Sequence, residues 1–214
     1  MKIRNPKNNG GYTILELLIV MFIIVLLATI ALTSYQKQRV RLTFDQSLIN
    51  VNNLIKTARN YATTSKKTPD GIIPESGYGI YIDLAEKKFV LFANVSDEDN
   101  SDDQYDVNGI EPDDIIMDDS SYIDINGVPN SEGYFLPNTT NFESIMNENK
   151  TDIPGGKVVI LFRPPLADTT ITTNTSPYTT IHTLYMKFSS QLDPEDKRTI
   201  KINATAGFPE IELK

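Results

Sequence analysis

Glu16 is the residue whose chemistry is hardest to reconcile with its neighbours in this sequence. It is the only charged residue in the run YTILELLIVMFIIVLLATIAL, from Tyr12 to Leu32. A carboxylate about one helical turn inside an apolar membrane segment costs a few kcal/mol unless it is paired or lies near the interface. Glu16 therefore needs a partner, unless its side chain reaches the interface or is protonated.

Catalysis would depend on one histidine. His182 is the only His in the chain and there is no Cys, so a site with two His ligands or a His–Cys pair cannot form. A Ser-His-Asp triad would have a single candidate base, and neither a nucleophile elbow nor a glycine-rich phosphate loop accompanies it. We expect no enzymatic activity, no catalytic residue, no metal site and no cofactor.

Acidic side chains gather in one stretch, residues 97–124, which contains no Lys or Arg. The segment DEDNSDDQYD could supply the six to eight hard oxygens that Ca²⁺ prefers, but the EF-hand order with Gly at its sixth position is absent. We favour a solvated, mobile loop that keeps the surface soluble. The acidic residues are Asp97, Glu98, Asp99, Asp102, Asp103, Asp106, Glu111, Asp113, Asp114, Asp118, Asp119 and Asp124.

A threonine-rich segment, DTTITTNTSPYTT at residues 168–180, offers many hydroxyl groups. It could be an O-glycosylated patch or a receptor-facing loop. β-Branched Thr is also common in exposed edge strands, and this is the interpretation we favour.

Composition excludes several partner classes. The formal charge of −8 and the pI near 4.7 argue against a nucleic-acid-binding surface, so we expect no direct nucleic acid partner. The absence of Cys excludes disulfides and thiolate metal sites. A chain of 214 residues with 40% apolar content predicts one globular domain with an appendage.

The appendage is the N-terminal region. Residues 1–11, MKIRNPKNNGG, are basic, contain no acid, and have the character of a targeting segment. The apolar run that follows is long enough to cross one bilayer, roughly 31 Å as a helix, whereas a secretory signal has a shorter apolar core. Charge does not fix the orientation, because similar numbers of basic residues flank the two ends. These are Lys2, Arg4 and Lys7 before the run and Lys37, Arg39 and Arg41 after it.

The helix should continue beyond the membrane. No Gly or Pro lies between Tyr12 and Thr68, which predicts one helix to about Ser65. Apolar residues recur at steps of three and four along its second half and predict a face that packs on a domain core. They are Phe44, Leu48, Val51, Ile55, Ala58 and Ala62.

After residue 75 the pattern changes to the period-2 alternation of antiparallel strands. Turns should dominate residues 94–156, where Asn108-Gly109 and Asn126-Gly127 are hairpin-turn dipeptides flanked by brief edge strands at Asp114–Met117 and Tyr122–Ile125. The longer predicted strands are Tyr78–Ile82, Phe89–Ala93, Lys157–Arg163, Ile181–Phe188, Thr199–Asn203 and Phe208–Leu213.

The N-terminal string resembles a known signal. Residues 10–35, GGYTILELLIVMFIIVLLATIALTSY, resemble the class III signal of type IV pilins and type II secretion pseudopilins: glycine, an aromatic, Thr, two aliphatics, Glu and an aliphatic helix. The resemblance implies that a prepilin peptidase cleaves between Gly11 and Tyr12 and N-methylates Tyr12. It also implies that Glu16 pairs with the terminal ammonium of the next subunit during assembly.

The resemblance also implies topology and partners. The leader would be cytoplasmic and the C-terminal domain extracytoplasmic, first on the inner membrane as a single-pass protein and then in a cell-surface or periplasmic filament. The implied partners are other pilin or pseudopilin subunits, the peptidase and methyltransferase, inner-membrane lipid and the assembly platform. Val25 and Thr33 stand where many members have Gly and Pro, so we expect a more regular helix.

Three further segments look like parts of the minor pseudopilin H and FimT-like family. They are ARNYATTSKK, GYGIYIDLAEKKFVLFAN and TIKINATAGFPEIELK, at the helix end, the first hairpin and the last hairpin.

The sequence thus predicts an α+β protein, with a long N-terminal helix followed by an antiparallel sheet or sandwich. We expect a leader at residues 1–11, a transmembrane part at 12–33, an amphipathic continuation at 34–65 and a β-rich domain at 66–214. The function that fits is a minor pilin or pseudopilin. The alternatives are a membrane-tethered module that binds calcium or glycan and, less favoured, a tethered hydrolase that uses His182.

Overall fold

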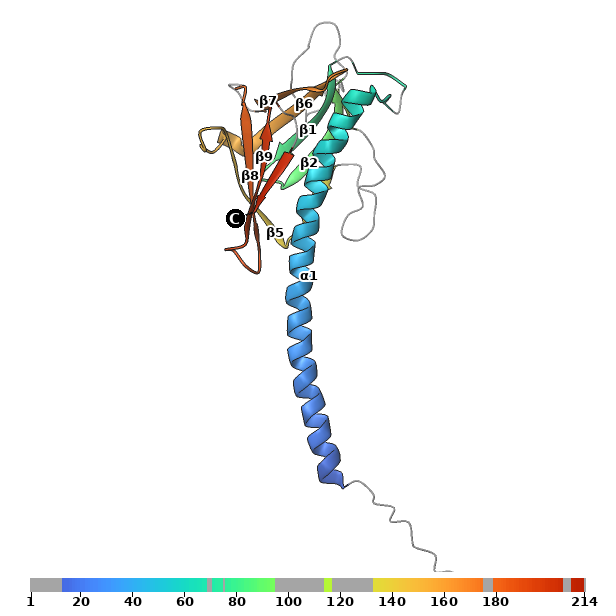
Figure 1. The fold of residues 1–214 in the computed structure, drawn as a ribbon, viewed down its shortest axis with the longest axis vertical. Coiled ribbons are helices and arrows are strands. Elements are labelled where there is room, and N and C mark those ends of the chain that lie inside the picture. The colour runs from blue at the N-terminus through green and yellow to red at the C-terminus, as the bar shows by residue number, and fades with distance from the viewer. Residues whose placement is uncertain are drawn as a thin grey trace, which may run out of the picture. The chain divides into compact units, whose positions relative to one another are not determined.

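The computed structural model describes residues 13–68, 71–74, 76–94, 114–116, 133–174, 179–205 and 209–213. Contacts divide the chain into two compact units, Met1–Val40 and Arg41–Lys214. One helix, α1 (Ile14–Thr64), runs through both units and is followed by antiparallel strands (Figure 1). The α+β class expected from the sequence is therefore confirmed.

Helix α1 ends where the sequence predicted. It is continuous through Val25 and Thr33, and the Thr33 hydroxyl donates to the Ile30 carbonyl at 2.9 Å. Ser65, just beyond the last helical residue, has a φ of +46°, and the Lys66 N–H donates to the Tyr61 carbonyl at 3.1 Å. A left-handed residue at this point is the usual way to terminate a helix, although Gly is the commoner choice.

The predicted stripe is the buried face of α1 within the second unit. Phe44, Val51, Ile55, Ala58 and Ala62 are fully buried, and Leu48 is 1% exposed. Three buried residues between them, Ser47, Leu54 and Tyr61, widen this face beyond the prediction. Ser47 and Leu54 lie three and four residues from stripe members on their two sides, and Tyr61 lies three residues after Ala58, so a broad apolar face rather than a narrow seam meets the core.

The strands form two antiparallel sheets. The first sheet has the order β3-β2-β1-β6-β7, with β4 also paired to β2, and the second has the order β10-β9-β8-β5. A short 3-10 turn, η1 (Pro154–Gly156), precedes β6. The strands are β1 (Gly77–Asp83), β2 (Lys88–Asn94), β3 (Asp114–Ile116), β4 (Tyr134–Phe135), β5 (Thr140–Met146), β6 (Lys157–Arg163), β7 (Asp168–Thr173), β8 (Thr183–Ser190), β9 (Lys197–Asn203) and β10 (Pro209–Leu213).

All six longer predicted strands are present. The brief strand expected from Asp114 is β3, and the Thr-rich segment contributes β7 as the last strand of the first sheet. Tyr122–Ile125 and both Asn-Gly turns lie outside the described residues. The expectation that turns dominate residues 94–156 is wrong for β5. Its register shifts between Phe142 and Ser144, and this bulge breaks the alternation that would have revealed a strand.

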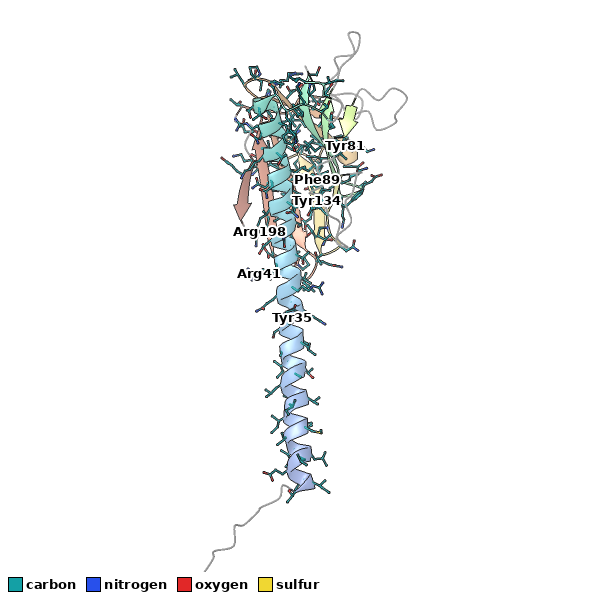
Figure 2. The ribbon with its side chains drawn as sticks, turned by 90° about the vertical axis from the view of Figure 1, so that its right-hand side faces the viewer. Tyr35, Arg41, Tyr81, Phe89, Tyr134 and Arg198 are labelled. Carbon is teal, nitrogen blue, oxygen red and sulfur yellow. The ribbon has the colours of Figure 1, made fainter. Side chains whose placement is uncertain are left out.

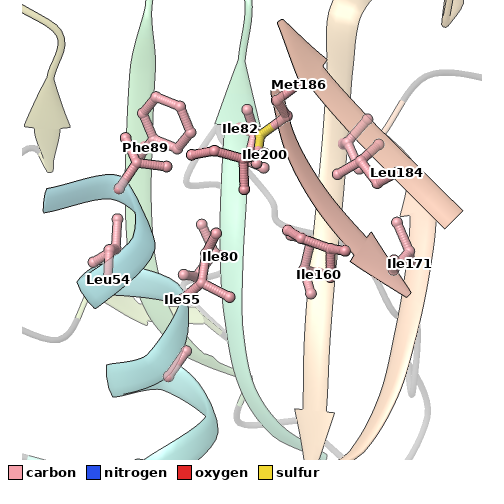
Figure 3. Packing of buried hydrophobic residues seen from close by; sticks show 14 of the residues in the cluster. Leu54, Ile55, Ile80, Ile82, Phe89, Ile160, Ile171, Leu184, Met186 and Ile200 are labelled. Carbon is pink, nitrogen blue, oxygen red and sulfur yellow. The ribbon is translucent and has the colours of Figure 1, made fainter. Parts of the chain in front are cut away.

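One core joins α1 to both sheets. Leu54 and Ile55 of α1 face the strands of the first sheet, and side chains of the second sheet complete the cluster (Figure 3). Three stacked rings run through the same core, with centroids 5.6 Å apart for Phe89–Phe142 and 4.7 Å apart for Phe142–Phe188. Such pairs contribute about 0.5–1.5 kcal/mol each beyond their buried area.

The first sheet also buries side chains on its opposite face. Tyr81, Val90, Phe92, Val159 and Leu161 form a second cluster, each no more than 2% exposed. They alternate along the strands with the residues of the main core, so β1, β2 and β6 are apolar on both faces. The period-2 alternation that we expected of the strands is therefore incomplete in β1, β2 and β6, which are buried along nearly their whole length.

Candidate functional site

The first turn of α1 carries Glu16, the residue that the sequence singled out. Thr13 is the residue before the helix, and its hydroxyl accepts a hydrogen bond from the Glu16 N–H at 3.3 Å. The Thr13 carbonyl also accepts from the N–H groups of Glu16 and Leu17, at 3.1 and 3.2 Å. Thr13 is thus the N-cap of α1, and Glu16 is the third residue after it.

Thr13 is a site residue that our sequence reasoning missed. The pair Thr13-x-x-Glu16 has the capping-box pattern, in which a Ser or Thr cap is followed three residues later by Glu or Gln. The signal was present in the sequence, directly before the apolar run. Glu16 also lies where a negative charge is favoured by the helix dipole, in the first turn.

The side chains around Glu16 are apolar and exposed. Ile14, Leu15 and Leu17 are 82%, 68% and 57% exposed in the isolated chain. Length and composition make α1 a candidate membrane span, and none of its most apolar window is buried by protein. This arrangement is consistent with membrane anchoring. Gly11 and Tyr12, the predicted cleavage and methylation positions, lie outside the described residues.

The alternative site at His182 lacks the contacts of a catalytic triad. His182 is exposed, and its backbone N–H donates to Glu148 Oε2 at 3.3 Å. The pKa of Glu148 is lowered, chiefly by a hydrogen bond from its own backbone N–H, and the His182 N–H adds to this while burial opposes it. In the part of the chain that the structure describes, no hydrogen bond joins the His182 ring to a Ser, Thr or Asp side chain.

The acidic stretch 97–124 lies outside the described residues except for the backbone of β3. Elsewhere, the described residues contain no cluster of three His, Cys, Asp or Glu side chains that could hold a metal ion. The calcium interpretation therefore stays a prediction.

Asp83 is the one carboxylate that the described part of the domain buries deeply, at 3% exposed. Its oxygens accept hydrogen bonds from the Ala85 and Glu86 N–H groups at 2.9 and 3.2 Å and from the Tyr81 hydroxyl at 3.0 Å, and Lys157 Nζ lies 3.5 Å away. Burial alone would raise its pKa, but the hydrogen bonds and Lys157 together lower it. Asp83 fixes the β1–β2 turn as an ionised group, which is a structural role.

Comparison with known families gives one result. Residues 6–32 match the family model described as the prokaryotic N-terminal methylation motif. The matched range includes Gly11, Tyr12 and Glu16. No curated protein and no solved structure matches this chain. The match supports a prepilin-type leader and, in general terms, a pilin-like structural subunit rather than an enzyme.

Proposed function

We propose that this chain is a minor pilin or pseudopilin, a structural subunit of a type IV pilus or a type II secretion pseudopilus. The observation that carries this proposal is the methylation motif at residues 6–32, which leads directly into an apolar helix. A filament subunit needs a cleavable leader, an anchoring helix and a folded domain. The chain offers a counterpart for each of these parts.

The proposal divides the chain by role. Residues 1–11 are the leader, 12–33 cross the membrane, 34–65 continue the helix and 66–214 form the extracytoplasmic domain. The domain has hairpins at the two segments that resemble minor pseudopilin H and FimT-like proteins, β1–β2 and β9–β10. The unbroken helix at Val25 and Thr33 is a second reason to favour a minor over a major subunit.

Glu16 would act during assembly. In the membrane its carboxylate has no fixed partner beyond its own helix end, and its burial is a penalty. In the filament it would meet the methylated Tyr12 ammonium of a neighbour in a charge-assisted pair. The ion pair offsets the desolvation cost of both groups only when the two subunits are in register. It would therefore favour one relative position of neighbouring subunits in the filament.

Processing is tested by the mass of the mature protein. In a host with the peptidase, intact mass and N-terminal sequencing should show loss of eleven residues, a new N-terminus at Tyr12 and one added methyl group. A mature chain that still carries Lys2 to Gly11 would refute the proposed function.

Assembly is tested at Glu16. Glu16→Ala and Glu16→Leu should insert in the membrane at least as well as the wild type but enter filaments poorly. An unpaired buried Tyr12 ammonium would cost on the order of 3–5 kcal/mol. The measurement is the amount of this subunit in sheared filaments relative to the membrane fraction, with the other pilins unchanged.

Glu16→Gln is the matched control because it keeps the shape and the capping-box pattern but loses the charge. It should behave like the Ala variant if the ion pair is what matters. Equal incorporation of the wild type and all three variants would favour a membrane-tethered module over a filament subunit.

A further inference from the structure

Five tripeptides of this chain have the pattern Asn-x-Ser/Thr, with a residue other than Pro in the middle. In exported proteins this pattern can accept a glycan on the Asn side chain. The pattern alone is not selective, because it recurs by chance in a chain that contains many Asn and Thr residues. The acceptor amide and the hydroxyl two residues later must also be accessible on the folded domain. The five tripeptides begin at Asn94, Asn138, Asn149, Asn174 and Asn203.

Burial argues against two of these tripeptides. Asn94 is 4% exposed, so a glycan on its side chain would not fit the closely packed domain. Asn138 is exposed, but Thr140, which completes its tripeptide, is fully buried, and the Thr140 hydroxyl lies 2.9 Å from Ser47 Oγ. The tripeptide at Asn174 continues into residues that lie outside the described part of the chain. The tripeptides at Asn94 and Asn138 are therefore unsuitable acceptors.

The tripeptide at Asn149 is exposed at both ends, but another side chain closes its turn. Asn147 Oδ1 accepts the Asn149 N–H at 3.1 Å and the Thr151 N–H at 3.0 Å. Lys150, between them, has a φ of +60°. The Thr151 N–H is thus already occupied, and among the described residues no donor contacts the Asn149 amide oxygen. Nothing in this turn orients the Asn149 amide toward the Thr151 side.

The tripeptide at Asn203 closes its own turn. Asn203 and Thr205 are both exposed, and Asn203 Oδ1 accepts the Thr205 N–H at 2.8 Å. This Asx turn holds the acceptor amide close to the residue that supplies the hydroxyl. The Ala204 N–H donates to the His182 carbonyl at 2.9 Å, which fixes the turn on the domain. In the part of the chain that the structure describes, no residue accepts a hydrogen bond from Asn203 Nδ2, so this nitrogen is available for reaction.

Strand β9 is anchored up to the residue before Asn203. Arg198, near its start, has its Nη1 3.1 Å from Asp45 Oδ1 of α1, and Figure 2 shows Arg198 beside this helix. Ile200 and Ile202 are fully buried in the main core. Asn203 is the last residue of the strand and points away from these contacts into solvent, as its exposure shows. A bulky hydrophilic group on its side chain would therefore not displace the strand.

We propose that Asn203 is an N-glycosylation site, whose co-substrate is a glycan carried on a lipid diphosphate. In the transfer, Asn203 Nδ2 forms a bond to the anomeric carbon of the glycan, and the bond from this carbon to the diphosphate oxygen breaks. The lipid diphosphate leaves with the bonding electrons, and one amide proton passes to a base of the transferase. The inference rests on the proposed function in one respect, because it needs the domain to be extracytoplasmic.

The test is the intact mass of the mature protein, purified from the membranes of its native host. We expect a mass above that of the processed, methylated polypeptide by one discrete glycan, which peptide fragmentation should place on Asn203. Asn203→Gln should abolish this increment. Thr205→Ala should abolish it as well, although this variant keeps Asn203 and the backbone N–H that closes the turn. Thr205→Ser, which restores a hydroxyl, should retain it.

Asn149→Gln and Asn138→Gln are the matched controls, and both should carry the full increment. An increment that persists in Asn203→Gln would place the glycan on another residue and refute the site. Absence of any increment from the wild type would refute it too. Retention of the increment in Thr205→Ala would show that the hydroxyl is not read, which contradicts an Asn-x-Thr acceptor.

The same spectra separate this proposal from the proposed function. A chain that begins at Tyr12 and carries no glycan would refute the glycosylation site and leave the filament function intact. A chain that carries the glycan on Asn203 but retains its leader would support the site and refute the proposed function.

Discussion

Two tyrosines on β1 make a matched test of how the domain is stabilised. Tyr78 and Tyr81 are 0% and 2% exposed, yet their hydroxyl groups differ in partners. The Tyr81 hydroxyl donates to the buried Asp83 carboxylate at 3.0 Å, whereas the Tyr78 hydroxyl is buried with no hydrogen-bonding partner. Replacing each by Phe keeps the ring and removes only the hydroxyl, so the two variants isolate that difference.

The expected changes have opposite signs. A hydrogen bond to a charged group is worth about 1.5–3 kcal/mol, so Tyr81→Phe should lower the free energy of unfolding by that amount. Tyr78→Phe removes a buried group that lost its hydration without compensation, so the variant should be as stable as the wild type or about 1 kcal/mol more stable. The two variants should therefore differ by at least about 1.5 kcal/mol, which is roughly 0.5–1.5 M in the urea midpoint.

The assay is urea unfolding of a soluble fragment that starts at Thr43, so that the buried stripe of α1 is kept. We expect this fragment to fold on its own. A double-mutant cycle with Asp83→Asn checks the mechanism, because the cost of Tyr81→Phe should fall when its charged acceptor is gone. Equal destabilisation by Tyr78→Phe and Tyr81→Phe would refute the reasoning, since it would require a partner for the Tyr78 hydroxyl.

Three further predictions use the same fragment. The lowered pKa of Asp83 stabilises the fold above the unfolded-state pKa and this contribution is lost as pH falls, so urea titrations below about pH 4 should show the wild type converging on Asp83→Asn. Ser65→Gly should raise the free energy of unfolding by about 0.5–1 kcal/mol by relieving the left-handed backbone, whereas Thr63→Gly, inside the helix, should lower it by a similar amount. Gly79→Ala should lower the free energy of unfolding by about 1–3 kcal/mol because a Cβ there overlaps the Phe92 ring. The loss should be smaller in a Phe92→Leu background, and thermal unfolding of the single and double variants measures the difference.

The sequence predicted the elements whose patterns are local. The run KVVILFR gave β6 with its bounds, and the absence of Gly and Pro gave the length of α1. Strand β5 was not predicted because its bulge at Glu143 displaces the apolar residues from strict alternation. A bulge depends on the partner strand, so a single sequence does not reveal it.

Contacts between distant parts of the chain could not be predicted either, because they too depend on the partner segment. The contact between Arg198 and Asp45 joins residues more than 150 positions apart, and nothing local marks either of them. The second apolar cluster on the first sheet was also not foreseen, because an apolar run does not say whether one or both faces are covered. By contrast, Gly11, Tyr12 and Glu16 could be proposed from the sequence, since the motif that contains them is a linear pattern.

The capping role of Thr13 changes how Glu16 should be understood. Cleavage at Gly11 would place a positive terminal amine one residue before the helix cap, where the helix dipole is unfavourable to a cation. A first-turn carboxylate offsets this, so Glu16 serves its own helix end before any neighbour arrives, and its penalty in the free membrane pool is smaller than for an unassisted buried acid. In the proposed assembly, Glu16 would thus interact with the dipole of its own helix before it meets the terminal ammonium of a neighbour. Assembly would therefore exchange an interaction within one helix end for an ion pair between subunits, so the net gain at Glu16 is smaller than for an acid that is unassisted in the membrane.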